Sequence, residues 1–417
     1  MPELSSPYFL LISAGIIIVL SYFYNIISQK TNIPSVLMLI ATGLVIKMLL
    51  DGADLESLNL MPILELLGIV GLIMIVLEAA LDLNLNKQKL PLIGKSMLLG
   101  ILGVLITGTA GVFIIKQFTE ADWHQSIFYA IPPAVISSAI VIPSVSSLKE
   151  EQREFLIYES TFSDIFGIMV FYFFESFVQA DQTGSMLISF GWTTLVTIVL
   201  SFILSYILVW AFQKIESGAK LFLLISVLVL LYSLGKIMHL SSLLIILTFG
   251  LVFNNRKLFF QGKLSKFIKP VAVRRILVDF RLITIETAFV VRTFFFIVFG
   301  MTIVLSQLVS LKVFSISMLM MAAVFGIRYI LLYLIDKKSL KTEVWIAPRG
   351  LITILLFFAI PAEYQIEDFE PGILLYIILG TGVLMSYSLI KNKQKDIYDD
   401  LLGDDLDDLE EREDQSF

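Results

Sequence analysis

Four polar side chains interrupt an apolar run that is long enough to cross a bilayer. Residues 155–178 read FLIYESTFSDIFGIMVFYFFESFV and include Glu159, Ser160, Ser163 and Asp164. A helix rises about 1.5 Å per residue, which would place Asp164 roughly 14 Å from the start of the run, near the middle of a ~30 Å hydrocarbon layer. A carboxylate at that depth costs about 2.5–3.5 kcal/mol on insertion scales, so this face should line a polar cavity. Because the two serines share the helical face of Asp164, the pattern predicts an ion- and proton-binding site.

Three more charged residues are predicted at membrane depth. They are Glu78 in GLIMIVLEAALDL, Arg292 in IETAFVVRTFFFIVFGMTI and Arg349 in EVWIAPRGLITILLFF. A guanidinium keeps its proton in practice, so each arginine must find a carboxylate or carbonyl groups. Measured from the cytoplasmic ends of their runs, Glu159 lies about 6 Å deep, Arg349 about 9 Å and Arg292 about 11 Å. These depths predict a Glu159–Arg349 pair and an Arg292 that senses or competes at the Asp164 site. A Glu78–Arg292 pair is the alternative.

Two of the apolar runs contain helix-breaking residues. The run 125–147 has prolines on both sides of Ser137 and Ser138, and the run 343–361 contains the sequence APRG. Proline removes a backbone donor and frees carbonyl groups, so both spans should be broken within the membrane. Paired broken spans at equivalent places in two repeats are the best sequence indication of a transporter's midplane site. We therefore add Ser137 and Ser138 to the predicted ion site.

The composition indicates an all-α polytopic membrane protein. The chain has 417 residues, of which 57% are hydrophobic and only 16% charged, and none is cysteine. Its mean hydropathy is +0.89. Apolar length and punctuation predict about thirteen spans, which form two inverted six-helix repeats with an additional span between them. The predicted spans are 7–28, 33–50, 61–83, 92–117, 125–147, 155–178, 186–212, 219–238, 240–253, 285–309, 312–335, 343–361 and 371–390.

Charge in the connections predicts the orientation of the chain. Alternate connections are rich in Lys and Arg, whereas the others, such as DGADLES and EYQIEDFEP, contain almost none. The positive-inside rule then places the N-terminus outside and the C-terminus in the cytoplasm, with the cell membrane as the expected location. The predicted organisation is a transmembrane domain over 1–390, which includes a basic cytoplasmic linker over 254–284, and an acidic cytoplasmic tail over 391–417. The linker could contact lipid headgroups, and an ordinary linker helix is the alternative.

The sequence also argues against several classes of function. It contains no P-loop, no GxGxxG and no HExxH pattern, and no acid, base and nucleophile occur together in one pair of spans. We therefore expect neither an enzyme nor a cofactor nor a nucleic-acid partner, but a secondary transporter driven by ion gradients. An ion-coupled symporter of a small organic anion is the alternative, because it can share an inverted-repeat fold. A cation channel is a third possibility.

Four segments together resemble the monovalent cation:proton antiporters, the superfamily of sodium/proton exchangers. They are LEAALDLNL (77–85), SSAIVIPSV (137–145), YESTFSDIFGI (158–168) and APRGLITI (347–354). The resemblance implies a core domain and a dimerisation domain, usually in a homodimer. It also implies exchange of Na⁺, or of K⁺ or Li⁺, for H⁺ by alternating access.

The same resemblance suggests roles for individual residues. Asp164 corresponds to the carboxylate that binds cation and proton in turn, Glu78 to an acid that helps to coordinate the ion, and Arg349 to the arginine that pairs with Glu159. The chain departs from the family pattern at Ser163, which stands where an asparagine or a first aspartate is usual. It departs again in the broken fifth span, where a Thr-Asp-Pro sequence is replaced by the region of Ser137 and Ser138.

Overall fold

The fold is described from a computed structural model. It describes residues 7–31, 33–52, 61–83, 85, 87–179, 186–215, 220–237, 242–261, 270–303, 309–335, 340–367 and 369–392. Helices dominate these ranges, and no strand occurs in them. Eight of the described helices are long and apolar enough to cross a membrane, and three shorter apolar helices accompany them. The prediction of an all-α polytopic membrane protein is therefore confirmed.

The helices follow the predicted spans closely. The helices of 13 or more residues are α1 (Pro7–Thr31), α2 (Ser35–Gly52), α3 (Met61–Asp82), α4 (Leu90–Phe118), α7 (Glu150–Gln179), α8 (Met186–Phe212), α9 (Lys220–Ile237), α10 (Ser242–Asn254), α12 (Pro270–Thr302), α13 (Leu311–Ile335) and a final helix, Gly372–Asn392. The shorter ones are α5 (Trp123–Ala134), α6 (Ser138–Ser144), α11 (Arg256–Phe259), α14 (Leu340–Glu343) and α15 (Leu351–Phe358). Single 3₁₀ turns occur at η1 (Lys87–Lys89), η2 (Val145–Ser147) and η6 (Ala362–Tyr364).

The predicted basic linker is largely helical where it is described. Its residues 256–259 form α11, and residues 270–284 form the first half of α12, which continues into the predicted tenth span. This half was predicted as a connection because Arg274, Arg275, Asp279 and Arg281 lower its hydropathy. At 33 residues, α12 is about 50 Å long, well beyond the thickness of the hydrocarbon layer. Residues 262–269 and 393–417, which belong to the predicted linker and acidic tail, lie outside the described residues.

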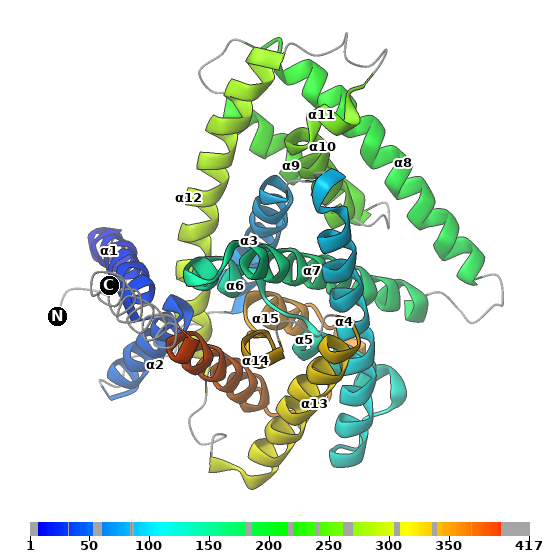
Figure 1. The fold of residues 1–417 in the computed structure, drawn as a ribbon. Coiled ribbons are helices and arrows are strands. Elements are labelled where there is room, and N and C mark those ends of the chain that lie inside the picture. The colour runs from blue at the N-terminus through cyan, green and yellow to red at the C-terminus, as the bar shows by residue number, and fades with distance from the viewer. Residues whose placement is uncertain are drawn as a thin grey trace, which may run out of the picture.

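Two groups of helices pack separately, with few contacts between them. In one group α4 packs against α5, α7 and α13, and α15 packs against α5. In the other α12 packs along α2 and α3, while α10 packs against α3, α8 and α9. The contacts between the groups are sparser and involve α15 with α3, α1 with α6, and α7 with α8. Figure 1 shows the short helices α5, α6, α14 and α15 at the centre, between α12 and the α4–α13 side.

Glycine allows the closest helix contact in the second group. A Cβ atom on Gly43 of α2 would lie 2.1 Å from the carbonyl oxygen of Ile297, and one on Gly300 of α12 would lie 2.3 Å from that of Ile40. Both distances are shorter than any real contact, so only glycine fits at either position. The backbones of α2 and α12 therefore touch directly, as is common where small residues face each other in membranes.

Candidate functional site

The two broken spans meet at the centre of the molecule. Helix α5 ends at Ala134 and α6 begins at Ser138, with an extended backbone between them. The other break precedes α15, where residues 346–350 are not helical. The N–H of Ser137 donates to the carbonyl of Pro348 at 2.9 Å and so joins the two breaks. A Cβ on Gly350 would lie 2.8 Å from the Ser137 hydroxyl oxygen, so glycine is needed for the crossing. These breaks agree with the prediction from proline and glycine.

Asp164 lies beside this crossing, on the middle of α7, and is only 4% exposed. Its Oδ2 accepts a hydrogen bond from the N–H of Ser138 at 3.0 Å. Its Oδ1 is buried and has no hydrogen-bond partner among the described residues. Asp164 also forms no ion pair with any described residue. A buried carboxyl oxygen without a partner is costly, so this atom calls for a proton, a water or an ion.

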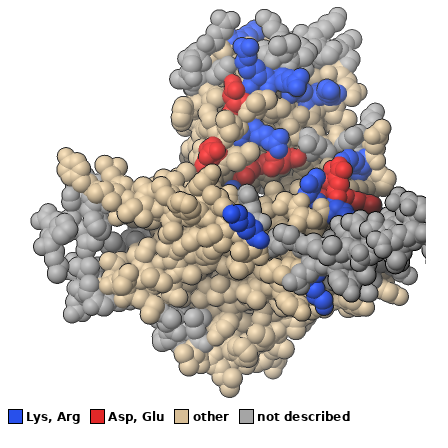
Figure 2. All heavy atoms as spheres, turned by 60° about the vertical axis from the view of Figure 1, so that its left-hand side comes forward, with Lys and Arg blue, Asp and Glu red and all other residues tan. Residues whose placement is uncertain are grey.

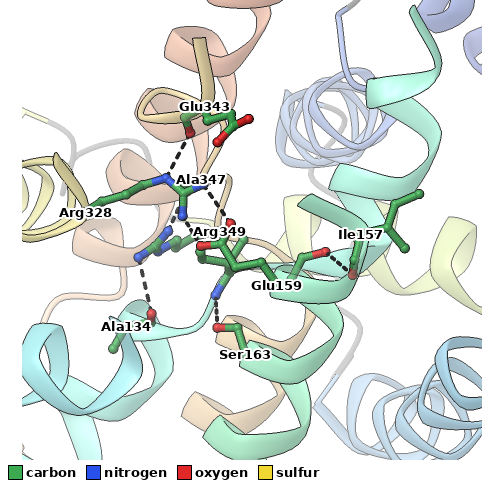
Figure 3. A network of polar contacts seen from close by, with 10 residues as sticks. Ala134, Ile157, Glu159, Ser163, Arg328, Glu343, Ala347 and Arg349 are labelled. Atoms are coloured by element: carbon green, nitrogen blue, oxygen red, sulfur yellow. Dashed lines mark hydrogen bonds and ion pairs between the residues drawn. The ribbon is translucent and has the colours of Figure 1, made fainter. Parts of the chain in front are cut away.

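The predicted serines lie around the same crossing. The hydroxyl of Ser163 accepts from the N–H of Ile136 at 3.0 Å (Figure 3), and Ser160 donates to the carbonyl of Ile157 at 3.2 Å. The Ser137 hydroxyl is buried without a partner among the described residues, as is that of Thr353 in the first turn of α15. Ser137, Ser138 and Ser163 are thus brought to Asp164 or to the break that contacts it.

Gly167 lets α7 approach the extended segment. A Cβ on Gly167 would lie 2.2 Å from Cγ2 of Val135 and 3.2 Å from its Cγ1. Val135 is fully buried directly after α5. Space at Gly167 therefore positions the backbone that carries Ser137 and Ser138 against α7.

We expect Gly167→Ala to destabilise the protein by about 1–3 kcal/mol, the usual effect of overpacking a buried site. Gly94→Ala is the matched control, because a Cβ on Gly94 of α4 would meet nothing within 4 Å. In that control, alanine should be neutral or slightly stabilising because of its helix propensity. Thermal unfolding of the purified proteins measures the difference, and equal melting temperatures for the two variants would contradict the role of Gly167.

The buried charge pair next to the site differs from the predicted one. The guanidinium of Arg328 on α13 makes a two-pronged ion pair with Glu159, one contact being 2.9 Å, and its Nε donates to the carbonyl of Glu343 at 3.0 Å (Figure 3). Arg328 and Glu159 are only 5% and 1% exposed. The prediction that Glu159 pairs with Arg349 is therefore wrong.

Arg349 instead binds backbone carbonyl groups. It donates to the carbonyls of Pro133 at 2.8 Å, Ala134 at 3.2 Å and Ala347 at 2.6 Å (Figure 3). The last carbonyls of a helix have no partner within it, and α5 ends at Ala134, so two of these acceptors are produced by the break. A guanidinium at the C-terminal end of a helix is also favoured by the helix dipole. Arg349 thus ties its own broken span to the other one.

Arg328 was missed in the sequence although a signal was present. It lies in the apolar run of residues 312–335, seven residues before the end of α13. Helical rise puts it about 10 Å from the end that was predicted to be cytoplasmic, at nearly the predicted depth of Arg349. The same reasoning that identified Arg292 and Arg349 would have identified it.

Glu78 and Arg292 form the alternative pair, on the wall of a cavity. Arg292 Nη2 lies 3.5 Å from Glu78 Oε1. The cavity has a volume of about 330 Å³, and its lining includes Glu78, Ser138, Glu286 and Arg292. One turn from Glu78, Asp82 pairs with Arg281 of α12. Arg292 is therefore held by Glu78, while Ser138 connects the cavity to the Asp164 carboxylate.

The chain is similar to known transport proteins over most of its length. The family described as sodium/hydrogen exchanger, transmembrane, matches residues 15–389. Two solved structures of the sodium proton antiporter MjNhaP1 from Methanocaldococcus jannaschii, one at pH 8 and one an electron-microscopy map, are each 21% identical to the chain with a TM-score of 0.68. The first covers 91% of this chain and 95% of its own, and the second 92% and 95%, so the likeness concerns the whole fold. Among curated proteins, none matches.

Proposed function

The chain belongs to the sodium/hydrogen exchanger family of multi-pass membrane transporters, and from that premise we propose that it exchanges Na⁺ for H⁺ by alternating access at Asp164. Antiport of a cation and protons is the activity of this family, which is a class of transporters and not of enzymes. The proposal concerns the cation, the mechanism and the residues. Family membership also argues against the alternative of an organic-anion symporter.

One observation supports this assignment most directly. The Asp164 carboxyl group is buried, forms no ion pair among the described residues and has one oxygen atom without a hydrogen-bond partner there. Burying a charge is unfavourable unless something neutralises it. Either a proton or a monovalent cation at Oδ1 would do so, and the two would exclude each other. Competition for one carboxylate is sufficient for exchange.

The neighbouring oxygen atoms suit a small cation. Ser137 offers a hydroxyl without a partner, and Ser163 and Ser160 offer hydroxyl lone pairs close to Asp164 along α7. Ser138 holds Oδ2 through its N–H, which orients Oδ1. We propose that these groups, together with Glu78 from across the cavity, coordinate the cation, because hard monovalent cations prefer oxygen ligands.

The division of the helices into two groups supports alternating access. The group with α4, α5, α7, α13 and α15 carries Asp164 and would act as the moving core, whereas the group with α2, α3, α10 and α12 would form the dimerisation domain of a homodimer. Neutralisation of Asp164 by either ion would allow the core to pass the apolar barrier. The empty, charged form would be held back by the cost of dehydrating a carboxylate.

The proposed orientation follows from the positions of the basic residues. In Figure 2, Lys and Arg side chains gather over the upper part of the visible face, and the lower part is nearly free of charge. The basic residues of α11 and of the first half of α12 belong to the predicted cytoplasmic surface, where they can contact anionic lipid. We propose a cell-membrane protein with its N-terminus outside and its acidic tail in the cytoplasm.

Flux measurements on reconstituted protein test the function. Proteoliposomes with an acidic interior should lose their pH gradient when external Na⁺ is added, whereas protein-free liposomes should not. Parallel additions of K⁺ and Li⁺ define the selectivity, and a clamped membrane potential separates exchange from channel conduction. Small organic anions should have no effect. If none of the three cations dissipates the gradient, the proposal is wrong.

A further inference from the structure

The guanidinium of Arg292 lines the cavity beside the proposed cation site, although cation binding at Asp164 does not require it. Arg292 lines it together with two carboxylates, Glu78 and Glu286. Its volume of about 330 Å³ is roughly ten times that of one water molecule in the liquid. Ser138 also lines the cavity and donates its N–H to Asp164. The cavity therefore extends from the wall that carries Arg292 to the backbone that holds the binding carboxylate.

The Arg292–Glu78 contact differs from a structural ion pair. It has a single close approach of 3.5 Å, at the outer limit of a hydrogen bond, and the side chains are 19% and 14% exposed. The Arg328–Glu159 pair, by contrast, is two-pronged, with side chains only 5% and 2% exposed. A long contact that is open to water can be displaced by a small cation, whereas a dry two-pronged one cannot.

We propose that Arg292 competes with the transported cation for Glu78. The Arg292 guanidinium binds Glu78 when the cation site is empty and leaves Glu78 when a cation binds. The inference rests on the proposed function, in which Glu78 is a ligand of that cation. A ligand that finds its site free for only a fraction of the time binds with an affinity reduced by that fraction. Arg292 thus sets the cation concentration at which exchange is half-maximal.

The remaining charge of the cavity favours cations over anions. Glu78 and Glu286 outnumber the single guanidinium of Arg292 among the charged side chains that line it. An excess of negative charge in a cleft raises the local cation concentration. When Arg292 leaves Glu78, its guanidinium therefore stays in a cavity that also contains the Glu286 carboxylate.

The test is the Na⁺ dependence of exchange in proteoliposomes. Arg292→Gln should lower the half-saturating Na⁺ concentration by about twofold to fivefold, the scale of a partly exposed ion pair. Glu78→Gln should raise it, since a ligand is lost. In the double variant the removal of Arg292 should have no further effect, because its partner is absent. A structural role would lower the maximal rate or the yield without lowering the half-saturating concentration.

Arg281→Gln is the matched control. Arg281 pairs with Asp82 across the same two helices, α3 and α12, but neither residue lines the cavity. Its half-saturating Na⁺ concentration should equal that of the wild type. If Arg292→Gln does not fold, Arg292→Met replaces it, because methionine keeps an apolar stem without the charge.

Two results would overturn the inference. One is a half-saturating Na⁺ concentration in Arg292→Gln, or in Arg292→Met if that variant replaces it, that equals or exceeds the wild-type value. The other is that Arg292→Gln changes the half-saturating Na⁺ concentration by the same factor in the wild type and in the Glu78→Gln variant. Both require a wild-type protein that exchanges, so they are distinguishable from failure of the proposed function, in which the wild type itself produces no Na⁺-dependent proton flux.

Discussion

Asp164→Asn should reduce Na⁺-dependent proton flux to that of protein-free liposomes. Asparagine has nearly the shape of aspartate, and its amide oxygen can still accept from the N–H of Ser138. It cannot be protonated or deprotonated in the working pH range and carries no charge to bind a cation. Because the proposed mechanism uses one carboxyl group for both ions, the loss should be complete at every pH and Na⁺ concentration, and not a shift of either dependence.

The variant should remain folded, so that the lost flux reports on chemistry. Replacing a buried, unpaired carboxylate with a neutral amide removes a desolvation cost, and the melting temperature should not fall. Glu151→Gln makes the same chemical change at the exposed start of α7 and should exchange like the wild type. Exchange at the wild-type rate by Asp164→Asn would refute the assignment of the carboxyl group.

Features that depend only on the depth of a residue in the bilayer could be predicted from the sequence. Hydropathy locates the spans, proline and the APRG sequence locate both breaks, and a charge within an apolar run identifies Asp164 without knowledge of any neighbour. The start of α12 was placed too late for the same reason, because its charged first half is helical but not apolar.

Pairing between spans could not be predicted in this way. Depth along the bilayer normal is a single coordinate, and Arg328 and Arg349 share it to within about 1 Å by helical rise. Which of them faces Glu159 is decided by the rotation and position of α13 and by the extended backbone before α15. The requirement for glycine at position 167 is equally hidden, since it depends on where Val135 lies.

Arg328→Met should destabilise the protein by about 3–5 kcal/mol, the cost expected when one partner of a buried pair is removed. Glu159 would be left charged and almost fully buried, and the carbonyl of Glu343 would lose the donor it has from Arg328. Glu159→Gln should be less harmful, because the amide oxygen can still accept from Arg328, but the guanidinium would then be unneutralised. Thermal unfolding in detergent, with the yield of monodisperse protein, measures both effects.

Comparison with an exposed pair isolates the contribution of burial. Arg281→Met removes the partner of Asp82, but the Arg281 side chain is 47% exposed, so the cost should be no more than about 1 kcal/mol.

A double-mutant cycle between positions 159 and 328 should show strong coupling, whereas the cycle between 159 and 349 should show less, because Arg349 binds carbonyl groups. Stronger coupling to Arg349 would instead favour the pairing predicted from depth. The two cycles therefore test whether Arg328 of α13, and not Arg349 of the extended segment before α15, fixes the first half of α7 through Glu159.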